Sequence, residues 1–148
     1  MTRFKTVSLA ASLAAASLIA IGATPAFAGD VTLTLEGVQA APGDLYVSLQ
    51  TEEQFMQPRG SYGEIVKAPS AGSRTIMMKD VKPGDYAVSV WHDVDNDHQF
   101  TRATNGRPLD GWTMVNAEAL RDTPKFEQVK LTVPADGKAL TLKMVYAK

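Results

Sequence analysis

Apolar and polar residues alternate along several short segments of this chain, and this pattern constrains the fold more than any other feature. In residues 31–35 and 45–49, every second residue is Val or Leu, and the residues between them are Thr, Tyr or Ser. An extended strand points successive side chains to opposite faces, so a period of two predicts a strand with one buried face. Each such segment needs a second layer of structure to cover its apolar face.

The same pattern, interrupted by turn-forming residues, predicts about seven strands. They are expected, in chain order, at residues 31–36, 45–50, 74–81, 86–91, 112–115, 126–133 and 140–146. Pro-Gly pairs at 42–43 and 83–84, together with Gly137, supply the turn chemistry between strands. We expect the turns at 41–44 and 135–138 to form β-hairpins.

Short strands at regular spacing, with turns between them, are typical of an all-β sandwich or barrel. No helical patterns separate the strands, so we expect no parallel arrangement with crossover helices. We therefore predict an all-β fold, a single antiparallel β-sandwich of immunoglobulin or transthyretin type. A closed barrel is the alternative.

Residues 52–72 interrupt the alternation. Thr51 and Gln54 have the spacing of a capping box, which predicts the start of a short helix. Pro and Gly then recur, at Pro58, Gly60, Gly63 and Pro69, and make a long helix implausible. We expect a surface excursion that returns to a strand at residue 74.

The N-terminus has the three parts of a secretory signal peptide. Arg3 and Lys5 precede an uncharged run at 7–21, and the small-residue ending Ala26-Phe27-Ala28 follows. The run is shorter than the ~20 residues that span a bilayer, although an uncleaved anchor is the alternative. We expect cleavage after Ala28, a domain at residues 29–148 without a membrane span, and a periplasmic or secreted location.

Composition narrows the possible functions. The chain has no Cys, which excludes a lipidated cysteine anchor and any disulfide, so the core alone must hold the fold. Removal of two basic leader residues leaves 13 of the 15 Lys and Arg against 16 Asp and Glu, a net charge of −3. We expect no nucleic-acid partner, because such proteins cluster their basic residues.

An acidic segment follows the strand expected at 86–91. Asp93, Asp95 and Asp97 are spaced two apart, so their carboxylates can converge on one hard cation such as Ca²⁺. The Gln99 backbone carbonyl and Asp110 are the further candidate ligands, which makes residues 93–110 a candidate calcium loop. The alternative is a solvated turn in which Asp and Asn bond their own backbone.

The pattern is not that of a true EF-hand. Counted from Asp93, His98 stands where that loop has Gly, and Thr104 stands where it has a bidentate Glu. His92 has the same parity as the apolar residues of its strand, so we expect it at the rim of the core. A transition-metal site of His92 and His98 with a nearby Asp is the alternative.

Trp91 and Trp112 flank the acidic segment. Trp91 falls on the face of its strand that points away from the core, where it could stack on a sugar or a peptide. Trp91, His92 and Trp112 are therefore candidate ligand-binding residues for an extracytoplasmic glycan or protein. The alternative is that Trp91 packs beneath a neighbouring loop or a second layer.

Recognised catalytic motifs are absent from the sequence. It has no Gly-x-Ser-x-Gly elbow, His-Glu-x-x-His motif, phosphate loop, dinucleotide fingerprint or Cys nucleophile. Asp93 and Asp110 could form a glycosidase-like pair only at a suitable carboxyl separation. We expect a protein that is not an enzyme.

Several short motifs occur in an order that resembles the bacterial domain-of-unknown-function family 2141. They are Pro83-Gly84-Asp85-Tyr86-Ala87-Val88, His92-Asp93 with its acidic run, Gly106-Arg107-Pro108, Asp110-Gly111-Trp112, Asn116 and Thr123-Pro124-Lys125-Phe126. The resemblance implies an exported bacterial β-sandwich without an established activity. His98 stands where the family commonly has Gly, and Thr101 where it often has Asp; both departures weaken a cation loop. We predict a binding or accessory module with a Ca²⁺-stabilised loop, or one that uses the two tryptophans without metal.

Overall fold

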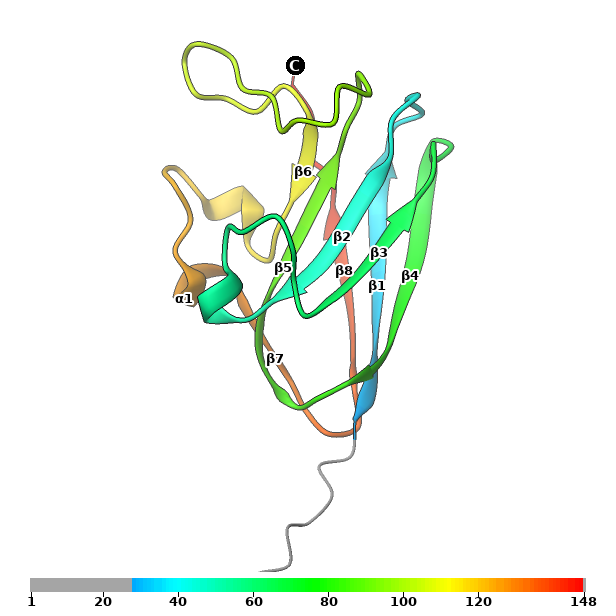
Figure 1. Ribbon diagram of the computed structural model, residues 1–148, viewed down its shortest axis with the longest axis vertical. Helices are drawn as coiled ribbons and strands as arrows, with labels where there is room; N and C mark the ends of the chain where they lie inside the picture. The colour runs from blue at the N-terminus through cyan, green and yellow to red at the C-terminus, as the bar shows by residue number, and fades with distance from the viewer. Residues whose placement is uncertain (1–27, 148) are drawn as a thin grey trace, which may run out of the picture.

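The computed structural model describes residues 28–147, and its strands form two sheets that enclose one core (Figure 1). The strands are β1 (Gly29–Val38), β2 (Leu45–Gln50), β3 (Tyr62–Val66), β4 (Gly72–Val81), β5 (Gly84–His92), β6 (Gly111–Thr113), β7 (Lys130–Val133) and β8 (Lys138–Lys143). The short helical segments are η1 (Glu52–Gln54), η2 (Ala117–Ala119) and α1 (Phe126–Val129). Except for Ala28, the predicted signal peptide lies outside the described residues.

The smaller sheet has the strand order β4-β1-β8, and the larger has the order β3-β2-β5-β6, with β7 also paired to β5. Strand β5 organises the larger sheet: β2 lies along one edge, while β6 and β7 share the other. The described residues thus contain eight strands. All pairs are antiparallel except β1 with β8, which is parallel, so the fully antiparallel prediction is wrong for this pair.

The core confirms the predicted parity of the strands. Val31, Leu33 and Leu35 of β1 face Val47 and Leu49 of β2 in one apolar cluster, and all five are almost completely buried. Burial of each such side chain contributes about 1.5–3 kcal/mol. The prediction of an all-β protein with two layers sharing one interior is confirmed.

Both predicted hairpins are wrong. Strands β1 and β2 belong to different sheets, and so do β7 and β8, so each connection passes from one sheet to the other rather than joining paired neighbours. Gly137 does have the expected positive φ, 87°. A turn signature indicates that the chain reverses, but it does not decide whether the next strand pairs with the last one or crosses to the facing sheet.

Strand β3 lies inside the segment that we expected to be an irregular excursion. It pairs with β2 at the edge of the larger sheet, and its central residues, Glu64 and Ile65 among them, are exposed. Because neither face is well buried, no alternation marks the strand in the sequence. The predicted capping box is confirmed, since Thr51 N donates to Gln54 Oε1 at 3.2 Å at the start of η1.

The expected strand at 126–133 divides into α1 and β7. Phe126 and Val129 have helical i, i+3 spacing, and both are buried against Ala87 in a second, smaller apolar cluster. The Lys125 N–H donates to Gln128 Oε1 at 2.9 Å and closes the first turn. Local side-chain capping therefore overrides the strand pattern at this point.

The last strand also ends earlier than expected, at Lys143. Val145 then leaves the smaller sheet and pairs with Trp112, through N···O distances of 2.8 and 2.9 Å in the two directions. The two sheets are thereby joined along one side. No helix within residues 28–147 is long and apolar enough to cross a membrane.

Candidate functional site

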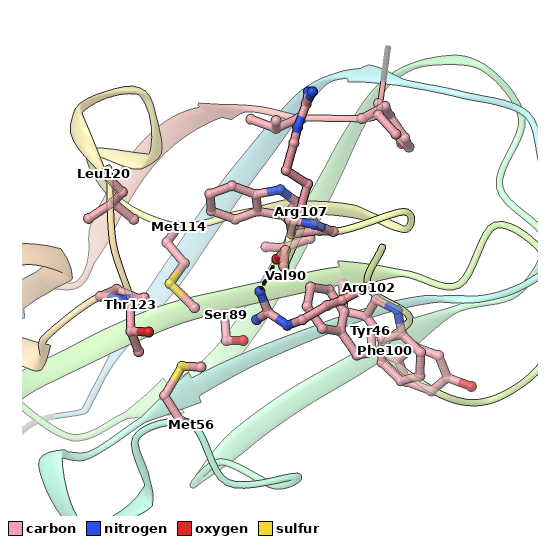
Figure 2. Close-up of a pocket in the computed structure, with 18 of the residues that line it drawn as sticks. Tyr46, Met56, Ser89, Val90, Phe100, Arg102, Arg107, Met114, Leu120 and Thr123 are labelled. Carbon is pink, nitrogen blue, oxygen red and sulfur yellow. Dashed lines mark hydrogen bonds between the residues drawn. The ribbon is translucent and has the colours of Figure 1, made fainter. Parts of the chain in front are cut away.

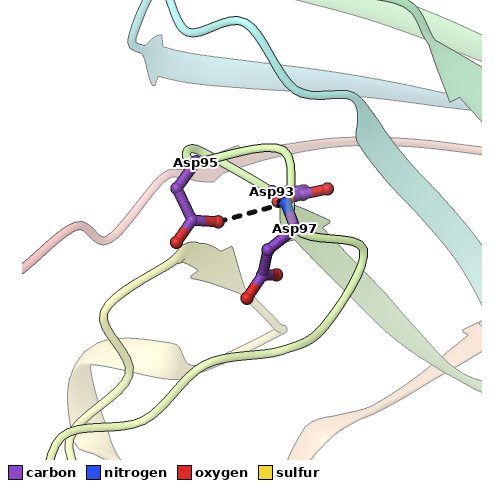
Figure 3. A group of neighbouring side chains, drawn as sticks. All are labelled: Asp93, Asp95 and Asp97. Atoms are coloured by element: carbon purple, nitrogen blue, oxygen red, sulfur yellow. Dashed lines mark hydrogen bonds between the residues drawn. The ribbon is translucent and has the colours of Figure 1, made fainter.

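The acidic residues lie in the loop that leaves the end of β5. Carboxylate oxygens of Asp93, Asp95 and Asp97 lie within 4.8 Å of one another, on a single turn of the chain (Figure 3). Their convergence is the arrangement that the spacing in the sequence predicts. Asp110, another candidate ligand, is not part of this group.

Asp93 is completely buried and is bonded to the loop itself. Its Oδ1 accepts from Asp97 N and its Oδ2 from His98 N, both at 3.1 Å, and His98 Nδ1 lies 3.4 Å from Oδ2. Asp97 in turn accepts from Gln99 N at 2.8 Å. The loop is therefore organised by side-chain-to-backbone bonds, as the solvated-turn alternative predicts. Carboxylates keep further lone pairs beyond these bonds.

Asp110 ties the two ends of the loop to the sheet. It is buried and accepts three hydrogen bonds, from Val94 N at 3.2 Å, Thr101 N at 2.9 Å and Trp91 Nε1 at 3.1 Å. The Gln99 carbonyl accepts from Thr101 Oγ1 at 3.5 Å. In this arrangement Asp110 positions the loop and Trp91 together.

The backbone of the acidic turn is left-handed at two positions. Asn96 has a φ of 60° and His98 a φ of 61°. Gly adopts this conformation without a steric cost, and Asn and His are among the other residues that adopt it most often. The pKa of Asp95 is raised, first by partial desolvation of its carboxyl group and next by the charge of Asp97. Cation binding would remove this repulsion.

His92 lies on the core face of β5, as its parity predicts. It is fully buried, and its Nδ1 is 2.8 Å from the Tyr146 hydroxyl, which also accepts from Gln39 N at 3.1 Å. His92 Nε2 is the only buried side-chain polar atom of the described residues without a partner. Burial lowers the pKa of His92, an effect that the charges of Asp110 and Asp93 partly oppose.

A groove of about 940 Å³ lies on the outer face of the larger sheet (Figure 2). The parity that buries Val47 and Val88 points the intervening residues of β2 and β5 outward. The floor comprises Tyr46 and Ser48 of β2, Ser89 and Trp91 of β5, and Trp112 of β6. His92, the third candidate ligand-binding residue, points to the opposite face of β5 and does not line the groove.

The aromatic residues of the floor form a row across three strands. Register places Tyr46 beside Trp91 and Trp91 beside Trp112. The rings of Tyr46 and Trp91 are stacked, with centroids 4.6 Å apart and an interplanar angle of 16°, and the Phe100 and Trp91 rings meet edge to face, with centroids 6.3 Å apart. One face of Trp91 is thus covered by Tyr46 of the neighbouring strand, while both tryptophans of the chain still line the groove.

The walls of the groove carry three arginines. Arg102 and Arg107 come from the loop before β6, and Arg121 comes from the segment after η2. The Arg102 guanidinium lies 4.9 Å from the centre of the Phe100 ring and donates to the Gly106 carbonyl at 3.1 Å (Figure 2). Within residues 28–147, none of the three arginines forms an ion pair.

The sequence alone does not mark these arginines as site residues. They fall in irregular segments, where no periodicity indicates which face of the sheet they would cover. The available signal is composition: residues 83–124 contain three Arg and no Lys.

Comparison with known proteins gives one match. No curated protein matches the chain, and no solved structure matches it. A family model described as "Uncharacterized protein conserved in bacteria (DUF2141)" matches residues 33–141, which include β1 from Leu33 and nearly all the strands described above. The chain therefore belongs to the bacterial family DUF2141.

Proposed function

We propose that this protein is an exported binding module whose ligand occupies the groove on the outer face of the larger sheet. The observation that carries the proposal is the groove itself. It is about 940 Å³ in volume, at the upper end of the range of ligand sites, and it combines aromatic side chains with a few polar groups. Export follows from the predicted signal peptide, and an immunoglobulin- or transthyretin-type topology is part of the same proposal.

The location of the groove supports this function. Paired strands form its floor, and loops form its walls, the usual division between a rigid scaffold and variable binding segments. Trp91 is held by the Asp110 carboxylate, and the same carboxylate accepts from the backbone of Thr101, which stands between the wall residues Phe100 and Arg102. The floor and one wall are thereby positioned by a single buried group.

The test uses tryptophan fluorescence, because both tryptophans of the chain line the groove. A ligand found in a panel of glycans, cell-wall fragments and peptides should change the emission. The variant Ser89→Tyr fills the floor and should abolish the response, whereas Ser73→Tyr, an exposed position of β4 in the other sheet, should preserve it. A response that survives Ser89→Tyr would place the site elsewhere.

A second candidate function, not exclusive of the first, is cation binding by the loop at 93–110. We propose that Ca²⁺ orders this loop through Asp93, Asp95 and Asp97. The support is that their carboxylate oxygens lie within 4.8 Å of one another. The expected dissociation constant is about 10⁻⁴–10⁻³ M, the range of extracellular calcium sites.

A further inference from the structure

We infer that the groove binds an acidic glycan, whose carboxylates are held by Arg102, Arg107 and Arg121. The inference depends on the proposed function, because it names the ligand class of that same groove. Three independent features of the groove support it: its charge, the state of its arginines and the polarity of its floor.

The charge of the groove is opposite to that of the whole chain. The protein has a net charge of −1, yet three arginines line the groove against a single acidic residue, Asp122. Every lysine of the described residues lies outside it, while only two of their five arginines, Arg59 and Arg74, do so. Arginine offers a planar, two-pronged donor that matches a carboxylate, so this selection favours an oxyanionic ligand.

The groove arginines are available to a ligand. Elsewhere in residues 28–147, two lysines pair with acids, Lys67 with Asp44 and Lys130 with Asp85. Arg102 forms no such pair, but its position over Phe100 and its bond to the Gly106 carbonyl restrict its motion. A restrained guanidinium loses less side-chain entropy when a ligand binds.

The floor favours a sugar over a peptide. Ser48 and Ser89 present hydroxyl groups, and the side chains of Gln57 and Asn105 also line the groove, which suits a ligand rich in hydroxyls. Peptides commonly bind sheets by adding a strand at an edge, but the groove lies over the face of a sheet whose strands are already paired. Trp112 adds an apolar surface of the kind that covers one face of a sugar ring.

The experiment is a set of fluorescence titrations with defined probes: trigalacturonic acid, its neutral counterpart galactotriose, oligoglutamate and inorganic phosphate. We expect trigalacturonic acid to bind at least about 10-fold more tightly than galactotriose, and its binding to weaken with added NaCl. Arg102→Gln and Arg107→Gln should each weaken binding by about 10- to 100-fold. The matched control Arg74→Gln, in the other sheet, should leave it unchanged.

Each contrary outcome has a distinct meaning. Equal binding of galactotriose, or binding unaffected by both groove substitutions, overturns the acidic-glycan inference and leaves the groove as a site for neutral ligands. If oligoglutamate or phosphate binds more tightly than trigalacturonic acid, the claim that the ligand is a glycan fails, while the claim that it is an oxyanion stands. Binding of trigalacturonic acid that persists in Ser89→Tyr shows that the groove is not the site, so the proposed function itself fails.

Discussion

Burial of His92 couples the core to pH. The folded protein holds this ring without contact with water, and the resulting loss of solvation outweighs the attraction of Asp110 and Asp93, so the pKa is lowered from its ordinary 6.5. Because the unfolded chain binds a proton more readily than the folded one, stability is greatest above the unfolded pKa and falls as the pH drops through it.

We therefore expect the urea concentration at the unfolding midpoint, measured in EDTA, to decrease as the pH is lowered from about 7 to about 5. One titrating group can contribute at most about 1.4 kcal/mol per pH unit. His92→Phe keeps an aromatic ring in the core and removes the titration, so its unfolding midpoint should depend less on pH. If the unfolding midpoints of the two proteins changed equally with pH, His92 would not be the group that causes the pH dependence.

Gly111 is required for close packing against Tyr146. A Cβ at position 111 would overlap the Tyr146 ring, whose hydroxyl bonds His92. We expect Gly111→Ala to destabilise the protein by about 1–3 kcal/mol in equilibrium urea unfolding, as overpacking does. Tyr146→Ala removes the obstacle, so the double variant should lose less stability than the sum of the two single variants. Additive losses would show that the two residues do not interact.

Among the elements, the acidic loop at 93–110 is the one through which Ca²⁺ should stabilise the protein. If its dissociation constant is about 10⁻⁴–10⁻³ M, millimolar Ca²⁺ stabilises the fold by about 0.4–1.4 kcal/mol, enough to raise the Tm by a few degrees. Thermal melts in EDTA and in millimolar Ca²⁺ measure the difference. Asp95→Ala should abolish it, since Asp95 is exposed and belongs to the converging group.

The control for this experiment is Asp136→Ala, which removes an exposed carboxylate from the turn before β8. Its response to Ca²⁺ should match that of the unmodified protein. Equal Tm values in EDTA and Ca²⁺ for the unmodified protein would leave the loop as a turn held only by its own hydrogen bonds, including those accepted by Asp93 and Asp110.

For the molecule as a whole, the leader prediction implies a defined mature product. When the full chain is expressed in a bacterium with a secretion system, we expect the exported protein to begin at Gly29, because Ala26-Phe27-Ala28 is a cleavage signature. Intact-mass measurement of the periplasmic fraction checks this expectation. A product that retains residues 1–28 would instead support the uncleaved-anchor alternative.

Elements with one buried face could be predicted from the sequence. Val31, Leu33 and Leu35 reveal β1 because water and core lie on opposite sides of that strand, and the same reasoning placed His92 inside and Trp91 outside. Strand β3 has no such contrast. Its central residues are exposed, so apolar and polar residues do not alternate along it. The convergence of Asp93, Asp95 and Asp97 was also predictable, because residues so close in sequence share one turn.

Only the tertiary structure decided which strands are neighbours and which loops face the groove. The alternation that defines a strand is local, whereas pairing depends on partners far away in sequence, such as β8 beside β1 and Val145 beside Trp112. Arg102, Arg121 and Tyr46 line one groove although they lie far apart in the sequence, so only the tertiary structure shows that they belong together. By itself, the sequence determined where the strands with one buried face form and which way their side chains point, because those properties depend on a residue and its immediate neighbours.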